Sequence, residues 1–585
     1  MIKIFNLKKL KNFKFLQPLQ ISFIHSWFTF HKLNKLVKQK TNRVVLGNFL
    51  PKKENFLYVP ASCLPYHISG YTTRTHEILK ALANAIGDIS RTTNIETTNS
   101  YENVSSNTTN HKFLDGKIFV LTRTGYPWDR KDSLVYPDAG KDYNILDGIR
   151  YDHLKTPKNS KLTALYAEEA SLEFEKYIVK NHISCVHAAS NHVNALPALI
   201  AAKRLGISFQ YEMRGLWELT RISRQPEFAK SHNFKLGLDL EAFVAKHADR
   251  VFVISNQLSL YIQKNWGIPK EKIFLLPNCA DVDKLKPDTS IEENSKEKSD
   301  LTIEDCDTES ALLSKDLSSL SSDVNNEKNS ENFIYAPSKI VIGYAGSLIV
   351  YEGLQTLLKA MDILVNRKNM NIHLNIIGDG EYRNTLEELA RSLGLNNNVT
   401  FFGRLSPLEA KNKQDECSLI CIPREPFEVC QIVPPIKLVE AMAKGKCVVV
   451  PDLPVFVDEL SIVDNVTNNK ALDSNSLSIS NSNFESSSKV GSAKQLSLEE
   501  LSNNDSGCIF FRSGNFENLA EVLANHLSNL DELVKRGIKA REYAIKNRQW
   551  KMFVPFIFPN FKNQLNTLNE NSKCTRCFSL KEGKE

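Results

Sequence analysis

The chain has 585 residues, of which 42% are hydrophobic and 24% are charged, so it is long enough for two domains with full cores. Its net charge of +7 is modest, and no segment reaches eighteen uninterrupted apolar residues, which predicts that no helix spans a bilayer. The eleven cysteines stand singly except Cys574 and Cys577, and an odd count without a signal peptide favours a reducing cytosol over a disulfide or zinc framework.

Residues 1–53 form a basic and aromatic arm with twelve Lys or Arg residues and no Asp or Glu. Its aromatic residues include Trp27 and Phe28. This composition suits an anionic membrane surface, whereas nucleic-acid binding and a disordered leader are the alternatives. Because Trp and Phe favour the membrane interface, we expect a membrane surface rather than a nucleic-acid partner.

Residues 54–287 alternate between short apolar runs and amphipathic segments, the pattern of a parallel sheet covered by helices. Strands are expected at 56–60, 118–121, 184–188, 208–212, 250–254 and 273–277. Ligands bind at the carboxyl ends of such strands, so polar residues in the connecting loops are candidates. These candidates include His192, Arg214 and Trp217.

The loop after the first strand holds further candidates. Gly70 would let the backbone approach a ligand at the free N–H groups of the following helix, expected over 75–85. Arg74 and His76 either serve chemistry or cap and solubilise that helix. A Ser, Thr and Asn-rich stretch at 89–115 predicts an inserted loop.

The second half of the chain begins after a change in composition. Residues 288–335 are expected to be an acidic, disordered linker, because 288–331 contain thirteen acidic residues, four lysines and no aromatic residue. The strand and helix pattern resumes over 336–545, interrupted by a second disordered insertion at 461–506. The remaining residues, 546–585, are expected to be a helix that crosses back to the first domain, followed by a tail.

Glycine turns follow two strands of this second half. Gly346 and Ser347 end the first strand, and Gly378 and Gly380 end the next. Backbone N–H groups in such turns bind phosphate, although a glycine pair alone is weak evidence. Arg404 follows at the end of another expected strand.

Residues 422–450 are the most informative stretch. They contain a turn around Arg424, then a short helix with Lys437 and Glu440 on one face, and then a buried strand. Gly445 fits the end of the helix. The acid can hold a ribose hydroxyl and the base a phosphate, whereas a surface ion pair is an equally good interpretation of the bare pattern.

These motifs, in this order, resemble the GT-B glycosyltransferases of the large retaining family 4, in a subtype with Tyr-Glu-Gly-Leu at residues 351–354. The resemblance covers roughly 56–285 and 338–555. It implies an α/β protein of two Rossmann-like domains that face each other across a cleft, with disordered insertions. The N-terminal domain would bind the acceptor, near Gly70, Arg74, His76, Arg214 and Trp217, and the C-terminal domain the donor.

The resemblance also implies roles for single residues. Glu440 matches the acid that binds the ribose, and Gln431 stands near its usual partner acid, so we expect Gln431 to bind sugar hydroxyls. Two usual diphosphate-binding cations are replaced by Ser347 and Glu352. The expected substitutes are Arg404, Arg424 and Lys437. The donor-binding set is expected to comprise Gly346, Ser347, Gly378, Gly380, Arg404, Glu428, Gln431 and Glu440.

A histidine that usually contacts the donor sugar is missing after His187, and His192 is the candidate for its place. The expected catalytic residues are therefore His192, Arg424 and Lys437. No metal or other cofactor is expected, because GT-B enzymes generally need none.

The implied function is transfer of a hexosyl group from a nucleotide-sugar to a hydroxyl of a glycan or lipid-linked glycan, with retention of configuration. The setting would be surface polysaccharide or lipid-linked glycan biosynthesis in the cytoplasm, at the inner face of the plasma membrane. The alternatives are an inactive sugar-nucleotide-binding or scaffold protein of the same fold, and another GT-B chemistry such as epimerisation or phosphorolysis.

Overall fold

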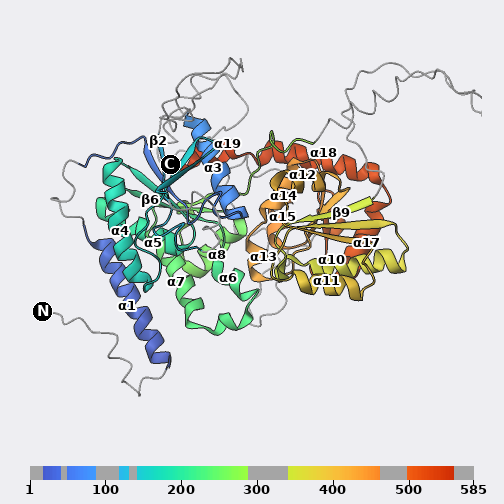
Figure 1. Cartoon of the computed structure of the whole chain (residues 1–585), viewed down its shortest axis with the longest axis horizontal. Helices are drawn as coiled ribbons and strands as arrows, with labels where there is room; N and C mark the ends of the chain where they lie inside the picture. Colours follow the sequence, from blue (N-terminus) through green and yellow to red (C-terminus); the bar gives the residue numbers. More distant parts are fainter. Residues whose placement is uncertain are drawn as a thin grey trace, which may run out of the picture.

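The computed structural model describes residues 18–40, 49–86, 117–130, 141–287, 340–461 and 497–558. These residues form two α/β domains that lie side by side, each built around a six-stranded parallel sheet (Figure 1). The expectation of two Rossmann-like domains is therefore confirmed. The segments expected to be insertions at 89–115 and 288–335 lie outside the described residues.

The N-terminal sheet has the strand order β2-β1-β5-β6-β7-β8, and all neighbouring strands are parallel. The central strands β1 and β5 are buried at every position and β6 at every position except its first, as expected where helices cover both faces of a parallel sheet. The strands are β1 (Asn55–Val59), β2 (Lys117–Val120), β5 (Cys185–Ala189), β6 (Ser208–Met213), β7 (Arg250–Val253) and β8 (Ile273–Leu275). The helices are α3 (Gly70–Ile86), α4 (Thr163–Lys180), α5 (His192–Leu205), α6 (Trp217–Ile222), α7 (His232–His247) and α8 (Asn256–Trp266), and an antiparallel hairpin joins β3 (Tyr143–Leu146) to β4 (Ile149–Asp152).

The C-terminal sheet repeats the plan with the order β11-β10-β9-β12-β13-β14. Its strands are β9 (Ile340–Ala345), β10 (Ile372–Ile377), β11 (Val399–Gly403), β12 (Leu419–Cys421), β13 (Cys447–Pro451) and β14 (Ile509–Phe511). Its helices are α10 (Leu354–Asp362), α11 (Arg383–Ser392), α12 (Pro407–Asp415), α13 (Glu428–Ile432), α14 (Ile436–Ala443), α15 (Pro454–Ser461), α16 (Leu498–Ser502), α17 (Phe516–Leu527) and α18 (Leu530–Asn547).

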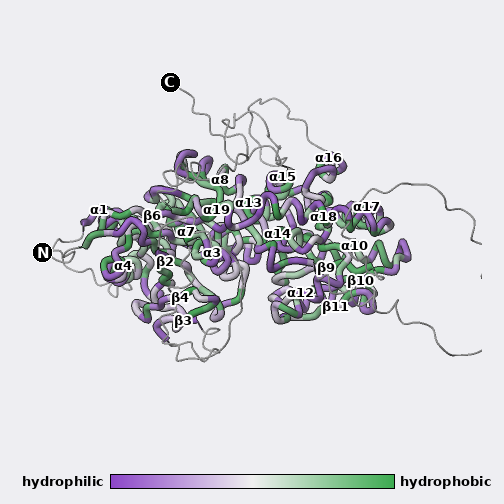
Figure 2. The backbone as a smooth tube through the Cα atoms, turned by 90° about the horizontal axis from the view of Figure 1, so that it is seen from above, coloured by the Kyte–Doolittle hydropathy of each residue, from purple (hydrophilic) through white to green (hydrophobic). Residues whose placement is uncertain are grey.

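The apolar core runs along the strands of both sheets and continues from one domain into the other (Figure 2). One cluster joins Leu216 and Leu258 of the N-terminal domain to Val429, Ile432 and Phe456 of the C-terminal domain. Apolar burial therefore holds the two domains together where α13 and α15 meet α6 and α8.

The chain returns to the N-terminal domain after α18. The short helix α19 (Trp550–Phe553) packs against α3, and the guanidinium of Arg74 lies 5.0 Å from the centre of the Trp550 ring. The backbone N–H of Ala280 donates to the carbonyl of Arg548 at 2.9 Å. The last described helical segment is thus part of the N-terminal core, in the place expected for a crossing segment.

Several local details differ from the sequence predictions. Helix α3 begins at Gly70 rather than near residue 75, because Ser69 and Thr72 close its first turn with reciprocal hydrogen bonds. Part of the expected insertion at 461–506 forms α16, where Ser497 and Glu500 make a capping box and Leu501 is buried. The basic arm contains a 21-residue helix, α1 (Pro18–Lys38), which rules out a disordered leader over that range.

Within the described ranges, no helix is both long enough and apolar enough to cross a bilayer. The eight cysteines within the described residues are all buried as free thiols.

Candidate functional site

The topology of the C-terminal sheet marks one place for a ligand. Strand β9 pairs with β10 on one side and with β12 on the other, so the chain changes direction between β9 and β12. The loops that leave two such strands diverge to opposite faces of the sheet and open a space at their carboxyl ends. Gly346 follows β9 there, and Arg424 lies in the loop after β12.

Two glycine turns meet at this edge. A Cβ on Gly378 would lie 1.9 Å from the carbonyl oxygen of Gly346, and Gly346 itself has a positive φ of 156°. The N–H groups of Gly346 and Leu348 donate to the carbonyls of Ile377 and Asp379, at 2.9 and 3.1 Å. The N–H of the exposed Ser347 is therefore the donor that this turn offers to a ligand.

A buried ion cluster lies beside the turn. One oxygen of Glu352 accepts a hydrogen bond from Arg424 Nη2 at 2.9 Å, and the other accepts from Lys437 Nζ at 2.7 Å. Only 4% of Glu352 and 7% of Arg424 is exposed. Glu352 stands where the resemblance leads one to expect a phosphate-binding cation. Its carboxylate lies between Arg424 and Lys437, two of the residues expected to replace that cation.

The ionisation of the cluster follows from these contacts. Burial alone would raise the pKa of Glu352, but the positive charges of Arg424 and Lys437 outweigh it and hold the pKa at about 2. Burial lowers the pKa of Lys437, which Glu352 partly offsets. Two cations face one carboxylate, so the ionised cluster retains positive charge for an anionic ligand.

The backbone positions both cations. Arg424 Nη1 donates to the carbonyl of Val433 at 2.8 Å, and a Cβ on Gly353 would lie 1.7 Å from the Pro423 carbonyl oxygen, so this loop requires glycine opposite it. Lys437 Nζ donates to the hydroxyl of Tyr344 at 2.8 Å. If Gly346 carried a Cβ atom, that atom would lie only 2.5 Å from Lys437 Nζ. The lysine head therefore lies directly against the glycine turn.

The other expected donor residues lie on separate elements of the C-terminal domain. Glu440 lies one turn after Lys437 on α14 and is partly exposed, and burial raises the pKa of its carboxyl although Lys444 and Lys437 oppose that effect. Gln431 donates its amide to the carbonyl of Pro426 at 3.2 Å. Arg404 is exposed in the turn after β11, and Glu428 is exposed at the first position of α13.

Residues 432–436, between α13 and α14, meet the N-terminal domain; we call this contact the seam. Ser255 Oγ donates to the carbonyl of Ile432 at 2.5 Å, and Asn278 Nδ2 donates to the carbonyl of Pro434 at 2.9 Å. A Cβ on Gly70 would lie 3.3 Å from Ile436 Cγ2. The start of α3 therefore abuts the start of α14, one residue before Lys437.

Two of the expected acceptor residues belong to a buried ion network. Arg74 and Arg214 both donate to the carboxylate of Glu212, at 3.0 and 2.9 Å, and Arg74 also donates to the backbone carbonyls of Leu276 and Pro277. These contacts favour a packing role over contact with substrate. His76 is also buried and bonds to Tyr151 and Asp147. Gly70 and Trp217, which is 50% exposed, remain accessible.

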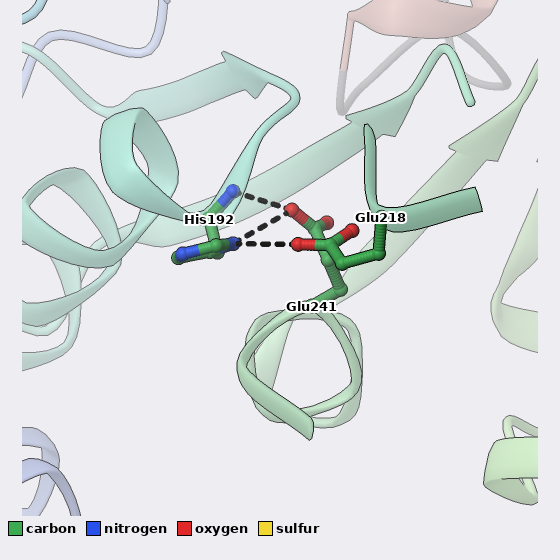
Figure 3. Close-up of side chains that lie close together, drawn as sticks. All are labelled: His192, Glu218 and Glu241. Atoms are coloured by element: carbon green, nitrogen blue, oxygen red, sulfur yellow. Dashed lines mark hydrogen bonds and ion pairs between the residues drawn. The ribbon is translucent and has the colours of Figure 1, made fainter. Parts of the chain in front are cut away.

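His192 lies at the start of α5 in a cluster with Glu218 and Glu241 (Figure 3). Its Nδ1 lies 3.1 Å from Glu241 and 3.9 Å from Glu218, and its backbone N–H donates to Glu241 at 2.6 Å. Burial lowers the pKa of His192, but Glu241 and Glu218 together outweigh it and raise that pKa. The Nδ1 side of the imidazole is therefore held by two carboxylates.

Among the described residues, this trio is the group whose geometry could hold a metal, since one ligand atom from each lies within 4.8 Å of the others. Both oxygens of Glu241 are already engaged, by the backbone N–H of His192 and by the hydroxyl of Tyr211. Glu218 has a pKa raised to about 7 by burial and by Glu241. The raised pKa values of His192 and Glu218 mean that protons on these two groups can offset the negative charge of the trio.

Sequence reasoning missed the role of Glu352 and the partners of His192. Glu352 reaches Arg424 and Lys437 across 72 and 85 residues, and His192 reaches Glu241 across 49. The position of Glu352 could have indicated this role, because it is an acid in the loop where the resemblance leads one to expect a cation.

The chain matches two family models, "Glycosyl transferase 4-like domain" over residues 113–279 and "Glycosyl transferases group 1" over residues 325–467. It is 32% identical over 112 residues to an uncharacterized glycosyltransferase of Methanocaldococcus jannaschii, a match that spans 19% of this chain and 26% of that relative.

Solved structures show the same fold. Sucrose-phosphate synthase of Thermosynechococcus elongatus is 13% identical, with a TM-score of 0.55, and the match covers 88% of this chain and 100% of that one. A glycosyltransferase of Rickettsia africae is 15% identical, with a TM-score of 0.51, and the match covers 88% of this chain and 99% of that one. Anabaena HepE in complex with UDP is 13% identical, with a TM-score of 0.50, and the match covers 88% of this chain and 100% of that one. The fold is thus GT-B, and with the two family models it supports assignment to the GT-B glycosyltransferases.

Proposed function

We propose that this protein is a retaining glycosyltransferase that moves a hexosyl group from a nucleotide-sugar to a hydroxyl group of a glycan or lipid-linked glycan. The observation that carries the proposal is the pair of cations, the buried Arg424 and the partly exposed Lys437, at the switch point of the C-terminal sheet, where Lys437 lies against the Gly346 turn. A diphosphate matches this combination of retained positive charge and a free backbone N–H.

The leaving group governs the chemistry. As the bond between sugar and diphosphate breaks, negative charge grows on the phosphate oxygens, and preorganised cations stabilise that charge. Arg424 and Lys437 fit this role because Glu352, Tyr344 and the Val433 carbonyl fix their positions. In this scheme the leaving phosphate accepts the acceptor proton on the front face, and no protein base or metal ion is required.

The roles of the surrounding residues follow from their placement. Glu440 is the proposed ribose ligand, because it is a partly exposed carboxylate one helical turn from Lys437. We assign Gln431 to sugar hydroxyls. The likeness to HepE, solved in complex with UDP-glucose, supports a nucleotide-sugar as the donor. The acceptor would enter from the N-terminal side of the seam, past Gly70 and Trp217.

The contact between Glu352 and both cations also gives weight to a second candidate, a protein of the same fold that binds sugar nucleotides without turnover. A panel of UDP-, GDP- and ADP-sugars tested by thermal shift identifies the donor, and analysis of products on extracted lipid-linked glycans identifies transfer. Binding without transfer or donor hydrolysis would favour the second candidate. No stabilisation by any member of the panel would refute both.

The ribose assignment has its own test. Glu440→Gln removes the carboxylate and keeps its shape, so the KM for the donor should rise about tenfold while kcat changes less, because ribose binding is made equally in the ground and transition states. An unchanged KM and kcat would remove Glu440 from the site.

A further inference from the structure

Helix α1 lies on the side of the N-terminal domain that faces away from the C-terminal domain (Figures 1 and 2). Its second half is anchored, because Leu33 and Leu36 are buried in the core beside α4 and α5. Lys32 Nζ also pairs with Glu168 at 2.6 Å. The helix is therefore a fixed part of the domain surface.

The first half of the same helix presents large apolar side chains to solvent. The exposed fractions are 72% for Phe23, 46% for Ile24, 59% for Trp27 and 36% for Phe28. Residues spaced by one, four and five positions share one helical face, and we call these four the α1 apolar face. In the rest of the described chain, exposed large apolar residues are scattered, so this face is a local concentration.

The charge of the sequence that contains this face selects the kind of partner. Residues 1–53 contain twelve of the 74 basic residues of the chain and none of its 67 acidic residues, so the remainder of the chain is net acidic. The seventeen residues before α1 alone include five lysines. A second copy of the chain would bring the same positive charge to the contact and be repelled. Nucleic acid would match the charge but leave Phe23 and Ile24 in water.

An anionic bilayer surface satisfies both properties. Its headgroups attract lysines, its acyl boundary takes up apolar side chains, and tryptophan prefers the boundary between the two. We propose that the α1 apolar face docks this protein on an anionic membrane surface, with the helix lying in the interface rather than crossing it. This inference is independent of the donor site.

The test uses the full chain and vesicles of phosphatidylcholine alone or mixed equally with phosphatidylglycerol. Co-sedimentation should show binding to the anionic vesicles and little to the neutral ones, weakened by high salt. The double variant Phe23→Ser, Trp27→Ser should lower the partition coefficient about tenfold or more, because two aromatic side chains no longer enter the apolar layer. Both residues are exposed, so the fold should tolerate the change.

Leu408→Ser on α12 is the matched control, since Leu408 is 67% exposed on the other domain. It should bind the anionic vesicles like the wild type, and donor-induced thermal shifts should be the same in all three proteins. Absence of binding to anionic vesicles would overturn the proposal, as would equal losses in the double variant and the control. The proposal would also be overturned if the double variant bound the anionic vesicles as well as the wild type does. It would likewise be overturned if the wild type bound no vesicles and the double variant instead lost an oligomer or a nucleic-acid complex that the control variant kept.

Discussion

Lys437 Nζ donates a 2.7 Å hydrogen bond to the carboxylate of Glu352, and its head also lies against the turn at Gly346. The carboxylate that neutralises one of the two cations thus lies after the first strand of the C-terminal domain, 85 residues before Lys437 in the chain. The charge proposed to bind phosphate is therefore the net positive charge of Arg424, Lys437 and Glu352 together.

The first prediction concerns that balance. Glu352→Gln removes a buried charge and leaves Arg424 and Lys437 uncompensated, so the free energy of unfolding should fall by roughly 3 kcal/mol. A bound nucleoside diphosphate would replace the lost charge. The nucleotide that stabilises the wild type should therefore raise the Tm of the variant by a larger amount, measured by calorimetry with and without ligand.

Glu416→Gln is a suitable control because Glu416 pairs with Lys413 at 2.7 Å on the exposed surface. Surface pairs contribute about 0.5 kcal/mol, so the control should unfold nearly like the wild type. If Glu352→Gln is no less stable than the control, or gains no more from nucleotide than the wild type, the charge balance is wrong.

Acid should weaken the same cluster. The pKa of Glu352 in the folded protein, at about 2, lies below the value of roughly 4.3 expected in the unfolded chain. Its contribution to stability is therefore complete above about pH 4.3 and is lost as the pH falls toward 2. Urea unfolding between pH 5 and 3 should show a shallower decline for Glu352→Gln than for the wild type. Parallel declines would contradict the assignment.

Glu218 should affect the pH dependence of stability in the opposite direction from Glu352. Burial and the charge of Glu241 raise the pKa of Glu218 to about 7, above the pKa of a glutamate in an unfolded chain. At a pH between these two pKa values, the folded protein holds a proton on Glu218 that the unfolded chain has lost. Stability should fall as the pH rises through this window. Glu218→Gln should therefore gain on the wild type between pH 5 and pH 8, whereas Glu227→Gln, at an exposed position nearby, should not. Equal pH profiles for both variants would refute this.

Metal removal is the next test. Arg424 and Lys437 meet the diphosphate charge in the proposed scheme, and the raised pKa values of His192 and Glu218 let these two groups carry protons beside Glu241. Donor binding and sugar transfer should accordingly persist after dialysis against EDTA. A loss of transfer that Mg²⁺ or Mn²⁺ restores would show that an ion is required.

Much of the architecture could be predicted because the strands are short, apolar and separated by polar turns. The buried run at Cys447–Pro451 and the helix end at Gly445, where φ is 72°, both follow from local chemistry. The hairpin β3–β4 was not predicted, because its strands are short and partly exposed. The boundary of α3 was missed because the Ser69–Thr72 hydrogen bonds extend the helix into the glycine loop.

For the ion cluster, the sequence allowed two members to be selected but did not allow their contacts to be predicted. Arg424 and Lys437 could be selected from one stretch of sequence, but their partner Glu352 depends on how β9 and β12 pair. Arg74 and Arg214 were selected as acceptor residues because they follow strand ends, yet both turn inward to Glu212. Side-chain direction at a loop depends on distant elements, which a linear pattern does not contain.

The most direct test of the central claim is nucleotide binding by Lys437→Met, measured by titration calorimetry. Methionine keeps most of the apolar stem and leaves Glu352 paired with Arg424, while it removes one of the two cations. If these cations hold a diphosphate, the Kd for the nucleoside diphosphate should rise by about tenfold to a hundredfold. Lys413→Met, at the surface, should bind like the wild type. Equal affinity in Lys437→Met and the wild type would contradict the claim that this cluster is the diphosphate site.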